Sequence, residues 1–424
     1  MREMKDSGIT YIGSIPSEWE IIPIKARYRF STGFTPPSGQ DEYYDPDGET
    51  WITIADMKDD ITVNSEKHIT KSYAEQKGKK VPKGSLLYSF KLSVGKTTML
   101  GCSAYTNEAI AAFPSDENPC TEYLRYSSMF IEGNANENIY GAKILNQQLI
   151  NNAPVPYPPM SEQYAIVKFL DPKCAAIGEA IERHKKAIEK LEEYKRASII
   201  SMVSGRSLNC DMKDSGIEWM TKVPIKWDVV PLRLVFEERK HKNVGMECQN
   251  LLTLSYGKLK RKDIYTNEGL LPASFEGYNI IEPGDIVMRL IDLQNDKHSL
   301  RTGLATERGI ITSAYVTLKP IKAVNSRYFR YLLHSYDLQK VLYTMGEGVR
   351  QSLNYDDIGR GLLLVVPDMT TQNNIADAIE QMEQHVDSMI IRQEQVIEKL
   401  EEYRKSLIYH AVTGKIDCRG VNAT

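Results

Sequence analysis

Two acidic residues and one lysine near the start of the chain are spaced like a site for phosphodiester chemistry. Asp47 follows a proline, and Asp56 and Lys58 follow in the segment ADMK. Two carboxylates beside a lysine can hold Mg²⁺ against a phosphate group. Short patterns of this kind also arise by chance, and a second, similar half of the chain has Tyr256 and Lys258 at the matching positions, with no carboxylate. We therefore interpret Asp56 as a residue of a loop or a strand end.

Other patterns of catalysis and cofactor binding are incomplete in this sequence. The segment SVGKTT ends like a phosphate-binding loop, but Phe90 stands where that pattern needs its first glycine. MGEGVRQ has Gln351 in place of the third glycine of a dinucleotide-binding motif. The histidines lack HxxxH spacing and the six cysteines contain no CxxC pair, which favours free thiols. We predict no catalytic residue, no metal ligand and no cofactor in this chain.

Basic residues gather in two segments instead. From residue 66 to residue 96 there are eight lysines and two glutamates, with Tyr73 and Tyr88 among them. The segment YGKLKRKD, from Tyr256 to Asp263, is the counterpart in the second half. Lysines attract phosphates without reading sequence, whereas Arg, Asn, Gln and Tyr reach the edges of bases. One such segment alone is equally well a solvated surface; two in equivalent places favour nucleic acid, although the net charge is −3.

An internal duplication predicts the elements that carry these residues. The segment MKDSGI occurs at Met4 and again at Met212, an agreement that chance gives about once in a thousand chains of this length. IEKLEEYK at Ile188 matches IEKLEEYR at Ile397 near the other ends of the halves, and the offsets are 208 and 209 residues. Matched ends around looser interiors indicate duplicated domains whose working surfaces have diverged.

Each half is predicted to hold a mixed domain of strands and helices. Short alternating or apolar runs bounded by Pro and Gly predict strands within 51–57, 85–92, 284–293 and 311–320. Helices are expected at 121–130 and 326–345. The chain has no run of about 18 apolar residues, and its first residues are polar, so we expect a cytoplasmic protein with no membrane contact.

A long helix is predicted to close each half. The first opens at Ser161, carries a heptad seam and ends at Gly205, and its counterpart ends at Gly414. His184 and Gln393 form a polar layer near the middle of the two seams. We expect the seams to pack on each other within the chain; pairing with another copy is the alternative.

Several segments in this order resemble the specificity subunit of type I restriction-modification systems. They are MKDSGI, TGFTPPS, KGSLLYSFKLSVGKTTM, TNEAIAAF and GAKILNQQLINNAPVPYPPMSEQYAIVKFLD ahead of IEKLEEYK. The resemblance implies an α+β chain with two mixed α/β target-recognition domains separated by two long helices, which pack as an antiparallel coiled coil in a pseudo-twofold internal repeat. The expected boundaries are 1–160 and 207–368 for the recognition domains, and 161–206 and 369–418 for the helices.

The same resemblance implies that the chain reads an asymmetric bipartite site in double-stranded DNA and does no chemistry itself. The expected partners are two methyltransferase subunits and two restriction subunits, which are motor nucleases. S-adenosylmethionine, ATP and Mg²⁺ are expected on those partners.

By residue, the resemblance places DNA contacts in GFTPPS, FKLSVGK and GAKILN of the first half. The second half departs from these patterns, so fewer residues are carried over there, and GVRQSLN is the counterpart of GAKILN. Lys58 and Lys258 are added as lysines at matching positions. The predicted DNA contacts are Thr35, Pro36, Ser38, Lys58, Lys91, Ser93, Lys96, Lys143, Asn146, Lys258, Arg289, Lys297, Arg350 and Asn354.

Two other functions stay open from the sequence. An autonomous metal-dependent DNA endonuclease would use Asp47, Asp56 and Lys58. A coiled-coil scaffold with no DNA role would show little dependence of DNA binding on salt, whereas neutralisation of phosphates makes affinity strongly salt-dependent.

Overall fold

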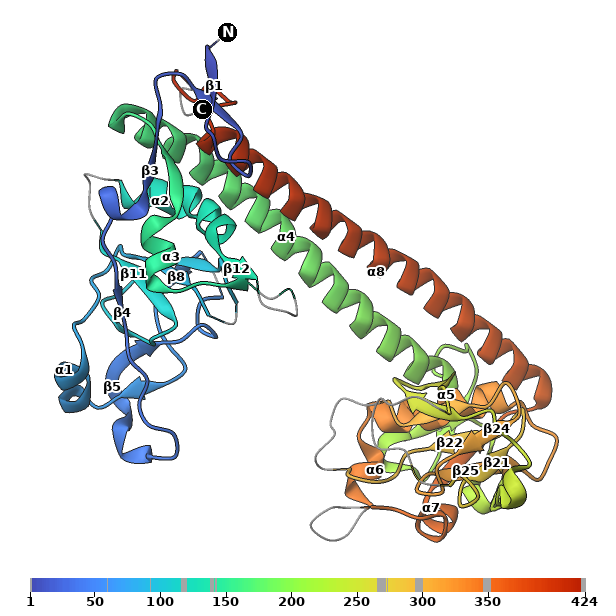
Figure 1. The fold of residues 1–424 in the computed structure, drawn as a ribbon. Coiled ribbons are helices and arrows are strands. Elements are labelled where there is room, and N and C mark those ends of the chain that lie inside the picture. Colours follow the sequence, from blue (N-terminus) through green and yellow to red (C-terminus); the bar gives the residue numbers. More distant parts are fainter. Residues whose placement is uncertain are drawn as a thin grey trace. The chain divides into compact units, whose positions relative to one another are not determined.

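The chain forms two compact units in a computed structural model (Figure 1). Unit 1 is Met1–Arg183 with Val396–Thr424, and unit 2 is His184–Gln395. The structure describes residues 2–58, 60–91, 93–115, 120–137, 141, 143–264, 272, 274–293, 300–345 and 352–420. Lys297 and Arg350, two of the predicted DNA contacts, lie outside the described residues.

Unit 1 is built around a five-stranded sheet in the order β4-β11-β8-β9-β6. Its strands are β4 (Ser31–Thr32), β11 (Ile110–Phe113), β8 (Leu86–Ser89), β9 (Thr97–Leu100) and β6 (Ile61–Thr62).

Both faces of this sheet are covered. Along β8, Leu86 and Tyr88 pack in one hydrophobic cluster and Leu87 packs in another. The alternation of strand side chains between two faces explains this division. A strand buried on both faces reads as a continuous apolar run.

The other elements of unit 1 surround this sheet. β1 pairs with β2, β3 with β14, β12 with β13, and β5 with both β7 and β10. Their bounds are β1 (Met4–Asp6), β2 (Ser14–Pro16), β3 (Glu20–Pro23), β5 (Tyr44–Ile52), β7 (His68–Ile69), β10 (Tyr105–Thr106), β12 (Asn136–Glu137), β13 (Lys143–Ile144), β14 (Pro154–Tyr157), α1 (Lys71–Lys77), α2 (Thr121–Ser127) and α3 (Gln147–Asn152), with 3-10 turns η1 (Ile24–Ala26), η2 (Asp41–Tyr43) and η3 (Ser128–Asn134).

Unit 2 holds a four-stranded sheet in the order β18-β25-β22-β23. Its strands are β18 (Phe236–Glu238), β25 (Val316–Pro320), β22 (Ile286–Met288) and β23 (Thr302–Leu304).

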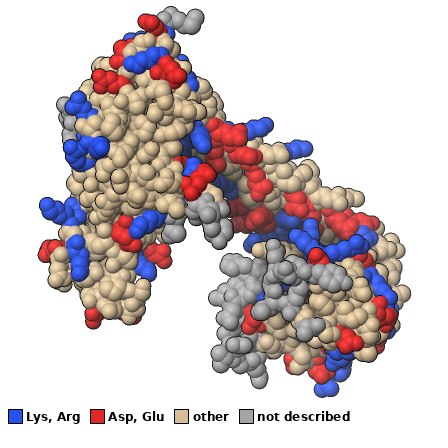
Figure 2. Space-filling model, in the orientation of Figure 1, with Lys and Arg blue, Asp and Glu red and all other residues tan. Residues whose placement is uncertain are grey.

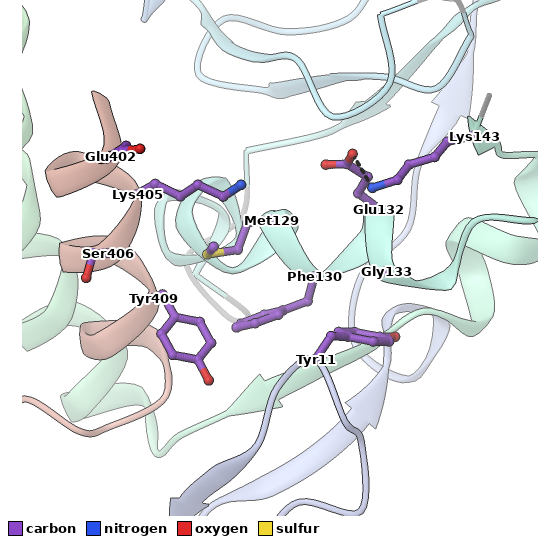
Figure 3. A pocket seen from close by; sticks show the side chains of 10 residues that line it. All are labelled: Tyr11, Met129, Phe130, Glu132, Gly133, Lys143, Glu402, Lys405, Ser406 and Tyr409. Carbon is purple, nitrogen blue, oxygen red and sulfur yellow. Dashed lines mark hydrogen bonds and ion pairs between the residues drawn. The ribbon is translucent and has the colours of Figure 1, made fainter. Parts of the chain in front are cut away.

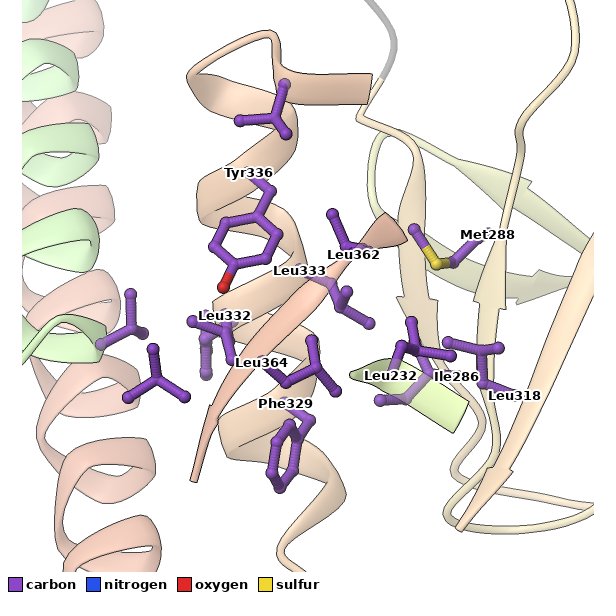
Figure 4. Packing of buried hydrophobic residues seen from close by; sticks show 14 of the residues in the cluster. Leu232, Ile286, Met288, Leu318, Phe329, Leu332, Leu333, Tyr336, Leu362 and Leu364 are labelled. Carbon is purple, nitrogen blue, oxygen red and sulfur yellow. The ribbon is translucent and has the colours of Figure 1, made fainter. Parts of the chain in front are cut away.

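Helix α5 (Ser326–Leu338) supplies the apolar side chains that cover this sheet (Figure 4). Phe329, Leu332 and Leu333 of α5 lie in one buried cluster with Ile286 and Leu318 of the sheet. Apolar residues at helical spacing predict this amphipathic face.

Further strand pairs and helices complete unit 2. β15 pairs with β16, β17 with β26, β19 with β20, and β21 with β24. Their bounds are β15 (Met212–Asp214), β16 (Lys222–Pro224), β17 (Asp228–Pro231), β26 (Leu363–Val366), β19 (Leu252–Ser255), β20 (Lys258–Arg261), β21 (Asn279–Ile281), β24 (Gly309–Ile311), α6 (Val341–Thr344) and α7 (Tyr355–Gly361), with 3-10 turns η4 (Glu218–Met220), η5 (Leu232–Leu234) and η6 (Val244–Met246).

Two helices of 44 residues each, α4 (Met160–Val203) and α8 (Met369–Val412), contribute to both units. A buried glutamine fixes the start of each helix, because Gln163 donates to the Pro158 carbonyl at 2.9 Å and Gln372 donates to the Pro367 carbonyl at 2.8 Å. No helix among the described residues is both long and apolar enough to span a bilayer.

Both helices end as predicted, at a glycine in the left-handed conformation. Gly205 has φ +72° and Gly414 has φ +68°. A Cβ atom on Gly205 would lie 2.5 Å from Cγ of Pro224, and one on Gly414 would lie 2.4 Å from Cγ of Pro16. Both prolines belong to the segments that follow the two copies of MKDSGI, so each duplicated start packs against a helix end within its own unit.

Within each unit the two long helices contact each other. In unit 2 the His184 ring and the Gln393 side chain share a hydrogen bond, and Lys195 pairs with Asp387 at 2.7 Å. In unit 1 Ile177 and Ala411 lie in one buried cluster. As the position on α4 rises from 184 to 195, its partner position on α8 falls, so the helix segments of unit 2 are antiparallel.

The strands predicted within 85–92, 284–293 and 311–320 are confirmed as β8, β22 and β25, whereas only Trp51 and Ile52 of the segment 51–57 belong to a strand, β5, and a turn follows them. The two shorter helix predictions need correction at their ends. α2 stops at Ser127 and a 3-10 turn follows, and the predicted helix 326–345 is divided into α5 and α6. Lys340, between them, has φ +62°, a left-handed conformation that an α-helix cannot contain.

Candidate nucleic-acid interface

In unit 1 the strand register brings three loops to one edge of the five-stranded sheet. Ala111 of β11 pairs with Thr32 at the end of β4 and with Tyr88 near the end of β8, and Tyr88 pairs with Thr97 at the start of β9. The loops 33–38, 90–96 and 107–109 therefore leave the sheet together. Two of these loops contain six of the predicted DNA contacts.

The loop 33–38 is tied to the loop 107–109. Thr35 is exposed, and its hydroxyl donates to the Glu108 carboxylate and accepts from Asn107 Nδ2 at 3.4 Å. Ser38 is exposed, whereas Pro36 is buried. The prediction of a DNA contact at Pro36 is at odds with this burial, because a buried ring shapes the turn and does not meet a ligand.

The loop 90–96 carries exposed basic and hydroxyl groups. Lys91 and Ser93 are exposed, and Lys96 is half-buried because its ammonium group donates to the Ile54 carbonyl at 3.4 Å. This bond ties the loop to the turn that precedes the exposed Lys58. Three predicted lysines thus come from two segments that lie next to each other.

Asp56 forms the turn itself, as expected from the sequence. Its carboxylate accepts hydrogen bonds from Thr53 N at 2.8 Å, from Thr53 Oγ1 at 2.6 Å and from Glu66 N at 2.8 Å. Asp47 is exposed on β5, where its own N–H donates to Asp45. Bonds of this kind hold a loop in shape, and they engage both oxygens of the carboxylate that the nuclease hypothesis requires.

Lys143 and Asn146 lie beside the loop 90–96. Lys143 is exposed and pairs with Glu132 at 2.6 Å, and a Cβ atom on Gly95 would lie 3.1 Å from the same glutamate. Asn146 is exposed and caps α3, since its side chain accepts from Leu149 N at 2.8 Å. Both predicted contacts also have a structural role. Lys143 neutralises the Glu132 carboxylate, and Asn146 caps the start of α3.

A pocket of about 510 Å³ borders Lys143 in unit 1 (Figure 3). The Lys143–Glu132 ion pair lies on one side of the pocket, and Lys405 of α8 extends into it from the other. Aromatic and sulfur-containing side chains form another part of its lining, and the remaining lining residues are Gly133, Glu402 and Ser406. The aromatic and sulfur-containing side chains are Tyr11, Met129, Phe130 and Tyr409.

In unit 2 the equivalent edge of the four-stranded sheet carries Arg289. Met288 at the end of β22 pairs with Thr302 at the start of β23 and with Val316 at the start of β25. Leu353 N donates to the Leu290 carbonyl at 2.8 Å, which brings the neighbouring Asn354 beside this loop. Arg289 is half-buried and Asn354 is exposed.

Asn354 caps α7 in the same way that Asn146 caps α3. Its side chain accepts from Asp357 N at 3.1 Å, and the Asp357 carboxylate accepts from Asn354 N at 2.7 Å. This reciprocal pair is a capping box. The sequence match between GVRQSLN and GAKILN is therefore explained in part by helix initiation.

The residue that sequence reasoning missed in unit 2 is Arg301. Its guanidinium is fully buried and donates to the carbonyls of Arg289 at 3.2 Å, Ile291 at 3.0 Å and Asp292 at 3.3 Å. The Asp337 carboxylate accepts from the backbone N–H of Arg301 at 3.1 Å. The available signal in the sequence was Asp337, an acidic residue on the apolar face of α5. A buried carboxylate there requires a partner. Arg301 fixes the course of the loop that carries Arg289.

Lys258 lies on the β19-β20 hairpin, a two-stranded sheet separate from the four-stranded sheet that carries Arg289. It is exposed at the start of β20, where it borders a groove of about 340 Å³ that Glu380 and Glu383 also line. Arg330 from α5 donates to the carbonyl of Gly257 at 3.3 Å and braces the adjacent turn.

Acidic and basic side chains both lie on the exposed surface of the long helices (Figure 2). The exposed glutamates of the duplicated segment are Glu189, Glu192 and Glu193 in α4 and Glu398, Glu401 and Glu402 in α8.

Two of the shifted pKa values in unit 2 belong to buried groups, His334 and Asp285. Burial lowers the pKa of His334 to about 3, and the positive charges of Arg330, Lys195 and Arg196 act in the same direction. Burial raises the pKa of Asp285, although its ion pair with Arg239 opposes the shift. All six cysteines are free. Among the described residues, no three His, Cys, Asp or Glu side chains meet as a metal site.

Comparison with known proteins finds one family likeness. Residues 16–193 match the family described as "Type I restriction modification DNA specificity domain". A curated specificity chain, the type I restriction enzyme MjaIX specificity subunit of Methanocaldococcus jannaschii, is 26% identical over 194 residues, which are 43% of this chain and 43% of that protein. The match thus spans less than half of that relative.

One solved structure extends the likeness in fold beyond the matched segment. One chain, from work on complex assembly and conformational transition of the type I R-M system, has a TM-score of 0.63 at 12% identity and covers 95% of this chain and 99% of its own length. The HsdS subunit from Thermoanaerobacter tengcongensis has a TM-score of 0.47 at 12% identity, with 95% and 98% covered. The first likeness shows that the fold is shared over nearly the whole chain.

Matching contacts recur in both units of the chain. Tyr123 donates to the Pro156 carbonyl at 3.0 Å, and Tyr328 donates to the Val365 carbonyl at 3.1 Å. The segments YLRY and YFRY carry these tyrosines, so their resemblance in sequence reflects one shared anchor between a helix and the strand that precedes a long helix.

Proposed function

We propose that this chain is the DNA-reading subunit of a type I restriction-modification complex, with one recognition domain at 1–160 and another at 207–368. The observation that carries the proposal is a shared strand order. The sheets β4-β11-β8-β9 and β18-β25-β22-β23 present their loops at the corresponding edge, and these loops carry six of the predicted DNA contacts of unit 1 and Arg289 of unit 2. Two sheets with the same strand order and different loops can recognise two half-sites of different sequence.

The spacer in this proposal is an antiparallel coiled coil formed by the helices 161–206 and 369–418. His184 and Gln393 support it, because their separation of 209 residues equals the repeat offset. In an antiparallel pair with pseudo-twofold symmetry, residues related by the repeat meet each other only at the symmetry axis. A contact between repeat-related residues is therefore what a pseudo-twofold axis through the middle of the helices requires.

The helices also set the separation of the half-sites. About 30 coiled residues at about 1.5 Å each give roughly 45 Å. One turn of DNA is about 34 Å long. We therefore infer a bipartite site whose halves are separated by bases that the protein does not read.

In this proposal the chain performs no reaction of its own. It recruits two methyltransferase subunits, which flip adenine out of the duplex and methylate it with S-adenosylmethionine, and two restriction subunits that use ATP and Mg²⁺. Because its substrate is chromosomal DNA, we place the complex in the cytoplasm.

The experiment that tests the proposal measures affinity of the purified chain for duplex DNA at several salt concentrations. Contacts to phosphate through the loop lysines predict that log Kd rises with log salt, with a slope of about 0.9 for each phosphate neutralised. Replacing Lys91 by Ala is expected to reduce that slope by about one. A matched control is Lys405→Ala on α8, which leaves the slope unchanged. A DNA affinity that does not vary with salt would sink the proposal.

A further inference from the structure

The turn between β19 and β20 presents an aromatic side chain at its tip. Ser255 pairs with Lys258, so Tyr256 and Gly257 are the two turn residues. Their φ angles are +47° and +73°, as in type I′ turns, which favour Asn, Asp and Gly. A tyrosine in this conformation is strained, and with its side chain 77% exposed it gains little from burial. Folding alone therefore gives no reason for tyrosine at this position.

The hairpin under this tyrosine is firmly held. Leu254 and Leu259 pack in a hydrophobic cluster of their own, against the sheet that carries Arg289. A Cβ atom on Gly303 would lie 2.6 Å from Cδ1 of Leu254, so glycine in β23 is what allows the hairpin to approach so closely. The hydrogen bond from Arg330 to the Gly257 carbonyl holds the turn. The tip is preorganised before any ligand arrives.

The outer surface of the hairpin is basic and adjoins the proposed reading edge. Lys258 and Lys260 are exposed at alternate positions of β20. A Cβ atom on Gly257 would lie 3.1 Å from Cβ of Leu300, the residue before Arg301. The hairpin tip and the loop that Arg301 holds therefore lie next to each other.

We propose that the β19-β20 hairpin enters the major groove of the half-site read by unit 2, and that Tyr256 contacts its bases. The inference rests on the proposed function, since it names a specificity-determining residue of that DNA surface. A two-stranded ribbon fits the major groove, and an aromatic ring and a phenol hydroxyl offer apolar contact and hydrogen bonding to base edges. Lys258 and Lys260 hold the phosphates on either side.

The test uses the full-length chain with its methyltransferase partner and three duplexes: the recognised site, and the same site with one or the other half scrambled. The Tyr256→Gly variant removes the ring and relieves the turn, so its melting temperature is expected to equal or exceed that of the wild type. Its affinity for the intact site is expected to fall about tenfold. On the duplex whose unit 2 half-site is scrambled, the variant and the wild type are expected to bind with equal affinity. On the duplex whose other half-site is scrambled, the variant is expected to bind more weakly than the wild type. Tyr194→Ala, which removes another exposed tyrosine of unit 2, serves as the control and binds all duplexes like the wild type.

The outcomes separate this inference from the proposed function. Wild-type protein that binds the intact site no better than a scrambled duplex overturns the proposed function. Wild-type protein that discriminates, with a Tyr256→Gly variant of equal affinity on every duplex, overturns only the role of the hairpin. Unchanged DNA affinity with weakened binding of the methyltransferase assigns Tyr256 to a protein partner and also overturns the inference.

Discussion

Arg301 is the single residue on which the loop after β22 depends most. Its buried guanidinium donates to the carbonyls of Arg289, Ile291 and Asp292, and Asp337 supplies the compensating charge at 3.9 Å. We expect Arg301→Ala to lower the free energy of unfolding of unit 2 by about 3–5 kcal/mol, because removal of one partner leaves the other charge buried and uncompensated. Denaturant unfolding of the full chain measures the loss.

The matched control is Arg261→Ala. Arg261 also pairs with a carboxylate, that of Glu307, but its side chain is 73% exposed. An exposed pair contributes about 0–1 kcal/mol, so this variant is expected to unfold almost like the wild type. Equal losses for the two variants would show that burial of Arg301 is not what makes it important.

His334 gives unit 2 a defined sensitivity to acid. Its pKa is about 3 in the folded chain and about 6.5 when unfolded, so the unfolded state binds the extra proton between these values. Stability is therefore fully present above about pH 6.5 and is lost as pH falls toward 3. At pH 5.5 the loss is expected to be about 1.4 kcal/mol.

The measurement compares unfolding of the wild type and of His334→Gln at pH 7.5 and pH 5.5. The glutamine variant lacks the titrating group, so the part of the acid sensitivity due to this residue is absent in it. A wild type and a variant that lose the same stability between these pH values would contradict the assignment.

At the scale of elements, the ends of the long helices follow from their glycines. Gly205 has a positive φ and no room for a Cβ atom beside Pro224. We expect Gly205→Ala to destabilise unit 2 by more than about 1 kcal/mol. Gly178, inside α4, has nothing within 4 Å of a built Cβ, and Gly178→Ala is expected to stabilise the chain by about 0.5–1 kcal/mol. Opposite signs for the two variants in thermal unfolding check the argument, and like signs would contradict it.

The sequence was sufficient to predict these elements where the pattern is local. Heptads and terminal glycines predicted both long helices, and apolar runs between Pro and Gly predicted the central strands. It did not predict the break at Lys340, because nothing in the sequence forbids helix there.

Part of the candidate site was also predictable. The basic loops were found because lysines and arginines can be counted directly in the sequence. The burial of Pro36 and of Arg301 depends on which strands become neighbours, so neither was visible. Asn146 and Asn354 matched in sequence for their shared role as helix caps as well as for any contact with DNA.

At the scale of the whole molecule, the duplication gives both units the same framework of strands and helix ends but different loops. The strand order, the tyrosine anchors and the helix ends recur in both units, while the loops at the sheet edges differ. In the proposed function two such units read two sequences, and changes in one set of loops are expected to leave the other half-site unaffected.

The most direct test of DNA reading maps N6-methyladenine across the genome of the native host, with the gene present and with it deleted. We predict that deletion removes methylation from one bipartite motif with two unlike halves. Methylation that is the same in both strains would contradict the proposal that this chain guides an adenine methyltransferase to its sites.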